Sequence, residues 1–281
     1  MLAILGLTLS AGAGGAPAQL GLPLGFDPSV ARQGTTLLVR ADESLLSQNG
    51  RPADSVTFGL PHGMRVDTAS RQELCQRRQA ARSACPESSR IGFGRFGLAV
   101  RGYLPDGGEA ELVWALDAYL GEPERRGDAA SVMLTGRLLG ADTVAALLAP
   151  SLHTNVPSVA TTVGRLVRAS SGKYGVELQF AKLPVQLEVV APITATPRRL
   201  ELSLGAVRRI RQNFTRRFKI RTPSGYEIRK IPDHRLIGHY LFRTPPSCRG
   251  SWPSEVRARF AGVEKRTTRR ITCFKAGTAQ H

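Results

Sequence analysis

The chain has 281 residues, and its formal net charge of +17 arises from 39 Lys and Arg residues against 22 Asp and Glu residues. With 42% hydrophobic residues, this length can bury a substantial core in one large domain or two small ones. Beyond the N-terminal segment no stretch is apolar enough to span a bilayer, and no 20–50-residue repeat or low-complexity tract occurs. These features exclude a membrane protein with several spanning helices and a repeat array.

The first residues resemble an export leader. An apolar run covers residues 2–9, and Ala16-Pro17-Ala18 fits the small-x-small pattern before a cleavage site. We therefore predict a signal peptide over residues 1–18 and a secreted or extracytoplasmic location, in the cell envelope or outside it. No Lys or Arg precedes the apolar run, so an upstream start or a merely flexible N-terminus is the alternative. The rest, residues 19–281, is expected to form a single β-rich domain.

Alternation of apolar and polar residues predicts strands along most of the chain. Residues 112–120 are apolar on both faces apart from Asp117, which indicates a central strand. Residues 105–108, Pro-Asp-Gly-Gly, predict a hairpin turn. The strands expected in chain order are 36–40, 55–60, 92–103, 112–120, 131–138, 159–168, 176–180, 200–204, 214–221, 236–243 and 256–260.

Only two helices are predicted. Ser70 and Glu73 have the spacing of a capping box, which would start a helix running to about Ala81. The second helix would cover residues 142–148. Many strands with few short helices predict an all-β fold, an antiparallel β-sandwich or two adjoining sandwiches. Composition changes near residue 197, where a sub-boundary could lie, but the alternation continues across it.

Three sequence blocks carry a resemblance. They are Leu60-Pro61-His62-Gly63, then Cys85-Pro86 followed by Ser88-Ser89-Arg90-Ile91-Gly92, and the segment 238–248 that ends in Cys248. Together with Cys273, these blocks make residues 55–275 resemble a family of uncharacterised exported actinobacterial proteins, marked by a Cys-Pro-x-x-Ser-x-Ile-Gly block and a C-terminal Cys pair. The resemblance implies export and a β-rich fold, and it implies no chemistry.

The four cysteines are Cys75, Cys85, Cys248 and Cys273. An even number of cysteines in an exported chain predicts disulfides, and four cysteines allow three pairings. We favour the two local pairings, 75–85 and 248–273, each contributing roughly 3 kcal/mol through loop closure. A zinc or redox site would favour Cys-x-x-Cys spacing, which neither pair has. The second bridge is expected to brace the basic end of the chain.

Positive charge is concentrated near the C-terminus. Residues 198–281 contain 21 basic and 5 acidic residues, whereas residues 1–197 contain 18 and 17. If residues 214–221 form a strand, Arg217, Lys219 and Arg221 share one face, with Phe214, Phe218 and Ile220 behind them. The candidate anion-binding residues are Arg208, Arg209, Arg211, Arg217, Lys219, Arg221, Arg229 and Lys230.

Outside a cell, such a surface could contact anionic envelope polymers, acidic glycans, lipid headgroups or extracellular DNA. Sequence-specific nucleic-acid binding is not expected, because the chain has no helix-turn-helix, zinc-finger or ribonucleoprotein motif. The alternatives are a solvated basic surface and an edge strand that charge protects from aggregation.

Motifs of catalysis are missing from the sequence. There is no Gly-x-Ser-x-Gly elbow, P-loop or His-Glu-x-x-His. The glycines of residues 92–97 are in the wrong order for a dinucleotide loop and indicate a strand with close backbone contacts. His234 and His239 would point to opposite faces of a strand. We therefore assign no catalytic, cofactor-binding or metal-binding residue, and we expect a binding or structural role. A secreted hydrolase whose site is assembled from distant residues is the alternative.

Overall fold

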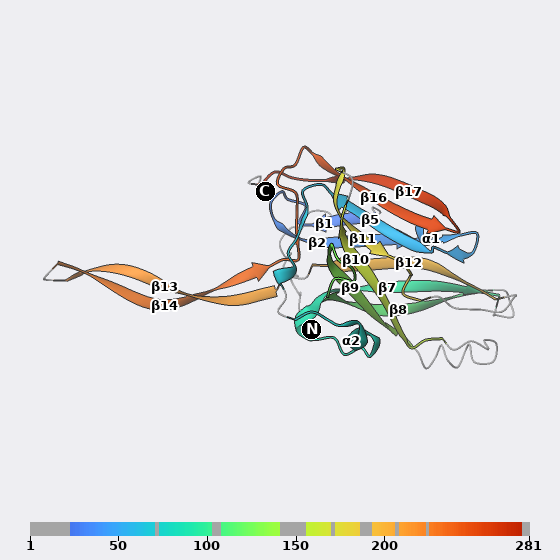
Figure 1. Ribbon diagram of the computed structural model, residues 1–281, viewed down its shortest axis with the longest axis horizontal. Coiled ribbons are helices and arrows are strands. Elements are labelled where there is room, and N and C mark those ends of the chain that lie inside the picture. Colours follow the sequence, from blue (N-terminus) through green and yellow to red (C-terminus); the bar gives the residue numbers. More distant parts are fainter. Residues whose placement is uncertain are drawn as a thin grey trace, which may run out of the picture.

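The computed structural model describes residues 23–70, 73–102, 108–140, 156–169, 172–185, 193–205, 208–222 and 225–276. The protein is all-β, with a large antiparallel sheet and two small two-stranded sheets (Figure 1). This confirms the fold class predicted from the alternation. The expected signal peptide, the turn at 105–108 for the most part, and the helix expected at 142–148 lie outside the described residues.

The strands follow one another in chain order with few helical turns between them. Their bounds are β1 Leu24–Asp27, β2 Gly34–Asp42, β3 Ser47–Gln48, β4 Arg51–Pro52, β5 Ser55–Pro61, β6 Arg65–Val66, β7 Arg90–Arg101, β8 Glu109–Gly121, β9 Asp128–Leu138, β10 Val159–Arg168, β11 Tyr174–Phe180, β12 Thr194–Leu204, β13 Arg208–Thr222, β14 Gly225–His239, β15 Phe242–Arg243, β16 Ser251–Phe260 and β17 Val263–Thr272. The helical elements are α1 Glu43–Leu46, α2 Arg77–Ala81, and the 3₁₀ turns η1 Thr68–Ser70 and η2 Glu87–Ser89.

The large sheet bends until its two ends approach each other. Its strand order is β17-β16-β5-β11-β10-β9-β8-β7-β12-β2-β15-β6, with β1 beside β2. β1, beside β2 near one end of this order, contacts β17 at the other end, and β6 at the first end contacts the interior strand β11. The rings of Phe26 in β1 and Trp252 in β16 meet edge-to-face with centroids 5.9 Å apart. The bent sheet therefore faces itself across one continuous hydrophobic core.

Most predicted strands are present, and the main errors concern β14, β15 and β17. Val159–Arg168 is β10 as expected, and 112–120 lies within the central strand β8. The single strand expected at 236–243 is divided in the structure: residues 236–239 end β14, which already begins at Gly225, and residues 242–243 form the separate strand β15. The sequence also failed to predict β17. β17 and most of β14 are exposed, so neither carries the alternation that a buried face imposes. The sequence also missed β1, β3, β4 and β6, which have two to four residues each and are too short to show a period.

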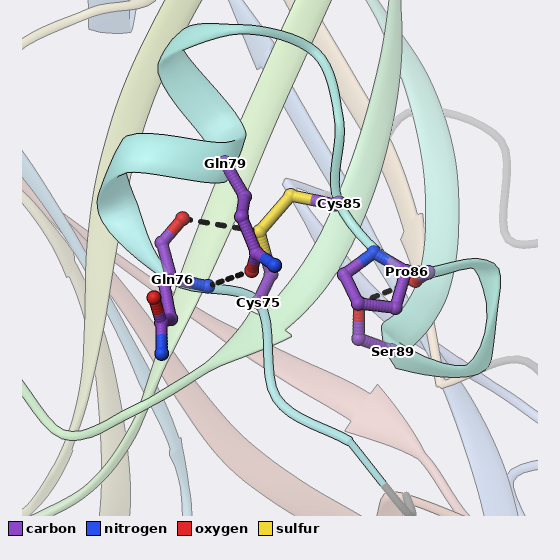
Figure 2. The surroundings of a disulfide bond; sticks show 6 residues. All are labelled: Cys75, Gln76, Gln79, Cys85, Pro86 and Ser89. Atoms are coloured by element: carbon purple, nitrogen blue, oxygen red, sulfur yellow. Dashed lines mark hydrogen bonds between the residues drawn. A yellow bond between two sulfur atoms is a disulfide. The ribbon is translucent and has the colours of Figure 1, made fainter.

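The first helix begins later than the sequence predicted. No α-helix starts at Ser70, which ends the 3₁₀ turn η1, and α2 covers Arg77–Ala81. Gln76 is its N-cap, and its backbone N–H donates to Oε1 of Gln79 at 2.8 Å (Figure 2). Glu73, expected to cap the helix, instead accepts a hydrogen bond from Ser88 Oγ at 2.8 Å. The capping-box prediction was therefore wrong in position, because a second pair of side chains with the same spacing caps the helix.

The disulfide between Cys75 and Cys85 holds this helix against the sheet (Figure 2). The Cys75 backbone N–H donates to the carbonyl of Leu120 at 2.8 Å. Fully buried Cys75 and Ala80 pack with Met133 of β9 in a small cluster of their own, separate from the main core. This explains why β9 is buried on both faces along most of its length. The bridge was predicted, and its role in covering the sheet was not.

The second disulfide joins Cys248 to Cys273, as predicted. It encloses β16 and β17, which pair with each other along their full length. The Trp252 indole N–H donates to the carbonyl of Ser247, next to Cys248, at 2.8 Å. The bridge therefore fixes an edge of the large sheet. The long hairpin β13–β14 lies outside the segment that the bridge closes.

Two glycines in β7 permit close packing of backbones, as the sequence predicted. A Cβ atom on Gly92 or Gly94 would overlap the carbonyl oxygen of Ser203 or Glu201 in β12. The pairing of β7 with β8 also shifts register between Arg90 and Gly92. Position 197, where composition changes, lies inside β12, which pairs with β7 and β2.

Candidate anion-binding surface

Strands β13 and β14 form a two-stranded ribbon, here called the arm, which projects from the body of the protein (Figure 1). Fifteen consecutive residue pairs join the strands, from Arg208 opposite His239 to Thr222 opposite Gly225. At roughly 3.3 Å per residue the arm is about 46 Å long. Its described side chains from Asn213 to Arg221 and from Gly225 to His234 are exposed or half-buried. Neither face is covered by the core.

One face of the arm is strongly cationic. Residues paired across an antiparallel ladder project from the same face, and so do residues two apart along a strand. The register therefore places four cations on a single face, and no acidic residue shares it in this part of the arm. We call this the cationic face, and its residues are Thr215, Arg217, Lys219, Arg221, Tyr226, Ile228, Lys230 and Pro232.

The opposite face is nearly neutral. Arg216 pairs with Asp233 at 2.7 Å (Nε to Oδ2), and Arg229 lies 3.6 Å from Glu227 (Nε to Oε1). These are the ion pairs among the described side chains of the arm. The charges of this face therefore compensate one another, and the charges of the cationic face do not.

Two of the cations lie directly opposite each other. Arg217 is paired with Lys230 across the ladder, and like charges in this position destabilise a hairpin. The charge of Lys219 is stabilised by a neighbouring aromatic ring. Its Nζ lies 4.4 Å from the centroid of the Tyr226 ring, a cation–π contact. An anion bound between Arg217 and Lys230 would relieve their repulsion.

The structure brings together only part of the predicted set. Arg217, Lys219, Arg221 and Lys230 share the cationic face, whereas Arg229 lies on the other face beside Glu227. The backbones of Arg208, Arg209 and Arg211 belong to the root half of β13, and their side chains lie outside the description.

The apolar side of β13 does not back onto a core. Phe218 and Ile220 lie opposite the cations as expected, but they remain 42% and 37% exposed. Sequence reasoning also missed Tyr226 and Ile228, which lie on the cationic face. The signal that could have found them was a second run of alternation after Gly225, with Tyr226, Ile228 and Lys230 in phase.

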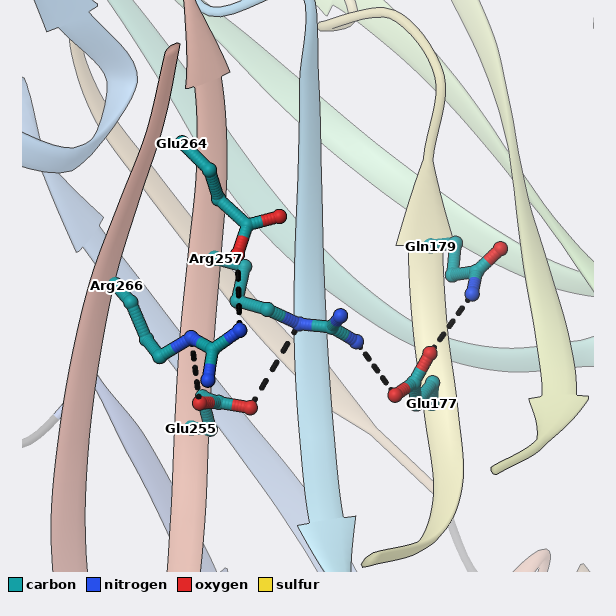
Figure 3. Close-up of polar contacts among 6 residues, drawn as sticks. All are labelled: Glu177, Gln179, Glu255, Arg257, Glu264 and Arg266. Atoms are coloured by element: carbon teal, nitrogen blue, oxygen red, sulfur yellow. Dashed lines mark hydrogen bonds and ion pairs between the residues drawn. The ribbon is translucent and has the colours of Figure 1, made fainter. Parts of the chain in front are cut away.

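Arg257 of β16 and Arg266 of β17 belong to a different environment. Arg257 Nη2 contacts Glu177 Oε1 at 2.5 Å, and its Nε lies 3.7 Å from Glu255 Oε2 (Figure 3). Arg266 contacts both Glu255, at 3.1 Å, and Glu264, at 3.1 Å. Glu177 and Glu255 therefore neutralise the positive charge of Arg257. The cationic face of the arm is separate from this network, since Arg257 lies on a strand inside the large sheet.

A second ion pair sits beside this network on β9 and β10. Arg165 donates from Nε and Nη2 to the two carboxylate oxygens of Asp128, at 2.8 and 2.6 Å. The Asp128 side chain is only 2% exposed. These hydrogen bonds hold the pKa of Asp128 below its ordinary value of 3.8. The ion pair thus links β9 to β10, and Arg165 already has an acidic partner.

Two hollows in the body offer candidate ligand sites. One, of about 310 Å³, is lined by Arg165, Glu177 and Arg257, whose charges are already paired with one another or with Asp128, and also by Arg125 and Arg259. The other, of about 540 Å³, includes His62 and Tyr174. His234 and His239 project from opposite faces of β14, as expected. Within the described ranges, no three His, Cys, Asp or Glu side chains are grouped as metal ligands.

Comparison with known protein families, with curated proteins and with solved structures found no match. No helix in the described part of the chain has the length and hydropathy needed to cross a membrane. The geometry of this chain alone therefore carries the functional argument.

Proposed function

We propose that this is an exported, disulfide-stabilised binding protein that uses the cationic face of the arm to contact an anionic partner in the cell envelope or outside the cell. The observation that carries the proposal is the arrangement of Arg217, Lys219, Arg221 and Lys230. These four cations share one exposed face of a projecting ribbon, and no acidic side chain shares that face.

The spacing of the cations suits an extended partner. Alternate residues of β13 lie about 6.7 Å apart along the strand, and Lys230 adds a second column across the ladder. Such a field accelerates encounters with anions and weakens as salt screens it. Because Arg217 and Lys230 repel each other in the free arm, part of the favourable binding energy comes from relieving that repulsion.

Export supports the same proposal. Both disulfides are present and no free cysteine occurs in the described residues, which is compatible with an oxidising compartment. Anionic partners in that setting include wall polymers, acidic glycans and lipid headgroups.

The test is binding of the full chain to inorganic polyphosphate over a series of salt concentrations. The variant carries Arg217→Gln, Lys219→Gln, Arg221→Gln and Lys230→Gln. The control carries Arg51→Gln, Arg249→Gln, Arg269→Gln and Arg270→Gln, which removes the same charge from exposed positions on the body.

We expect the arm variant to lose most of its affinity. A plot of the logarithm of the binding constant against the logarithm of salt concentration has a negative slope, and this slope should become less steep by about 3. The reason is that each of the four lost contacts with a single-stranded polyanion contributes about 0.7 to the slope. The control should keep nearly the wild-type slope. Equal losses in the two variants would show that only net charge matters, and would overturn the proposal.

A further inference from the structure

We propose that the arm docks on the surface of an anionic lipid bilayer, with Tyr226 and Ile228 inserted among the headgroups and upper acyl chains. This inference rests on the proposed function, because it takes the cationic face as the contact surface. It goes further by naming lipid as the partner and by assigning a role to apolar side chains that electrostatic binding to a soluble polymer leaves unused.

The arm carries much of the exposed apolar surface of the described residues. Of the nine large hydrophobic side chains that are exposed in the described residues, five lie on the arm. Tyr226 and Ile228 lie on the cationic face, whereas Phe218, Ile220 and Ile231 lie on the opposite face. Tyr226 and Ile228 are 65% and 63% exposed. A concentration of exposed apolar side chains on one projecting element marks an interaction site.

The position of Tyr226 and Ile228 beside the cations favours lipid as the partner. Ile228 is paired with Lys219, and Tyr226 is paired with Arg221, so each apolar side chain shares the cationic face with a cation. Both lie near the end of the ribbon that is farthest from its root at Arg208 and His239. A wall polymer or glycan satisfies the cations alone. A bilayer with anionic headgroups satisfies the cations and also removes the apolar side chains from water.

The residue types fit the interface of a bilayer. A tyrosine ring is apolar with a polar hydroxyl at its edge, and such rings concentrate at the level of the headgroups. Lys219, already stacked on the Tyr226 ring at 4.4 Å, has a long stem that can keep its ammonium at the phosphates while the ring inserts. The arm thus presents the two parts of an interfacial anchor on one surface.

The test uses vesicles of phosphatidylcholine with about one-third phosphatidylglycerol, and phosphatidylcholine vesicles for comparison. The variant is Tyr226→Ser with Ile228→Ser. The control is Phe93→Ser with Val263→Ser, which removes body side chains that are 61% and 63% exposed. The same proteins are tested against polyphosphate.

We expect the full chain to bind the anionic vesicles and not the neutral ones. The arm variant should bind the anionic vesicles at least about tenfold more weakly, since each inserted side chain contributes roughly a tenfold gain. Its affinity for polyphosphate should stay unchanged, and the control should match the wild type on both partners.

Insertion has a direct reporter as well. Trp114 and Trp252 are buried in the body, so brominated lipids should leave their fluorescence unquenched. The indole introduced by Ile228→Trp should be quenched when the protein binds, which tests insertion without weakening the arm.

The outcomes separate the two proposals. Polyphosphate binding that depends on the four cations, without vesicle binding or without quenching, would overturn the lipid inference and leave the proposed function standing. Loss of the four cations with no effect on either partner would overturn both.

Discussion

Removal of the Cys248–Cys273 disulfide should destabilise the body of the protein without affecting the arm. The bridge closes a loop with a sequence separation of 25 residues. In the chain-entropy model this loop contributes about 3.5 kcal/mol at 25 °C. Because both cysteines are buried, replacement by alanine adds a small cavity cost to that value.

The variant is Cys248→Ala with Cys273→Ala, and the assay is unfolding in urea followed by tryptophan fluorescence. Trp252 is well placed as a reporter, since it packs on Phe26 and its indole donates to the carbonyl of Ser247. We expect the free energy of unfolding to fall by at least about 3.5 kcal/mol, the loop-closure value, with the cavity cost added to it. The matched variant, Cys75→Ala with Cys85→Ala, should lose about 2.7 kcal/mol, because its loop has a separation of 10 residues.

The same variant tests whether this bridge supports the binding surface. The arm lies outside the closed segment, so the affinity of the folded Cys248→Ala, Cys273→Ala protein for polyphosphate should remain within about twofold of wild type, a small change in free energy. A stability loss below about 1 kcal/mol would refute the loop-closure reasoning. A marked loss of affinity would show that the bridge holds the arm in its binding geometry.

Two further predictions concern the body. Asp128→Asn should destabilise the protein by about 2–3 kcal/mol in urea unfolding, because it leaves the partly buried Arg165 without its charge partner; an unchanged midpoint would refute this. Since the pKa of Asp128 is lowered from 3.8, its stabilisation is complete above that pH and is lost as the pH falls through the folded pKa. Wild type should therefore lose its advantage over Asp128→Asn on acidification, and a constant difference would contradict the argument. Gly94→Val should prevent soluble expression or lower the thermal midpoint sharply, because its side chain would overlap the Glu201 carbonyl, whereas the same substitution at Gly172, which has open space around it and no left-handed backbone angle, should cost less.

The buried strands were predictable because burial leaves a record in the local sequence. A strand such as β10 alternates between core and exterior along its length, and that period can be read without knowing the neighbouring strands. The disulfide pairs were predictable for a similar reason, since each joins cysteines close in sequence. In contrast, α2 has Gln76 as its N-cap and does not start at Ser70, because two separate pairs of side chains, 70 with 73 and 76 with 79, have the spacing that caps a helix. The local sequence does not choose between them, whereas in the structure Ala80 of the second segment packs against Met133.

The sequence by itself determined the all-β class, the two bridges and the concentration of positive charge at the C-terminal end. Only the tertiary structure decided that β13 and β14 leave the sheet together as an arm, and that Arg257 is neutralised inside the body while Arg217 and Lys219 are not. The physical reason is that the side-chain period of a strand is a local property, whereas its partners depend on contacts between residues far apart in the chain. A basic stretch on an alternating strand has the same local pattern whether a core or water lies behind it.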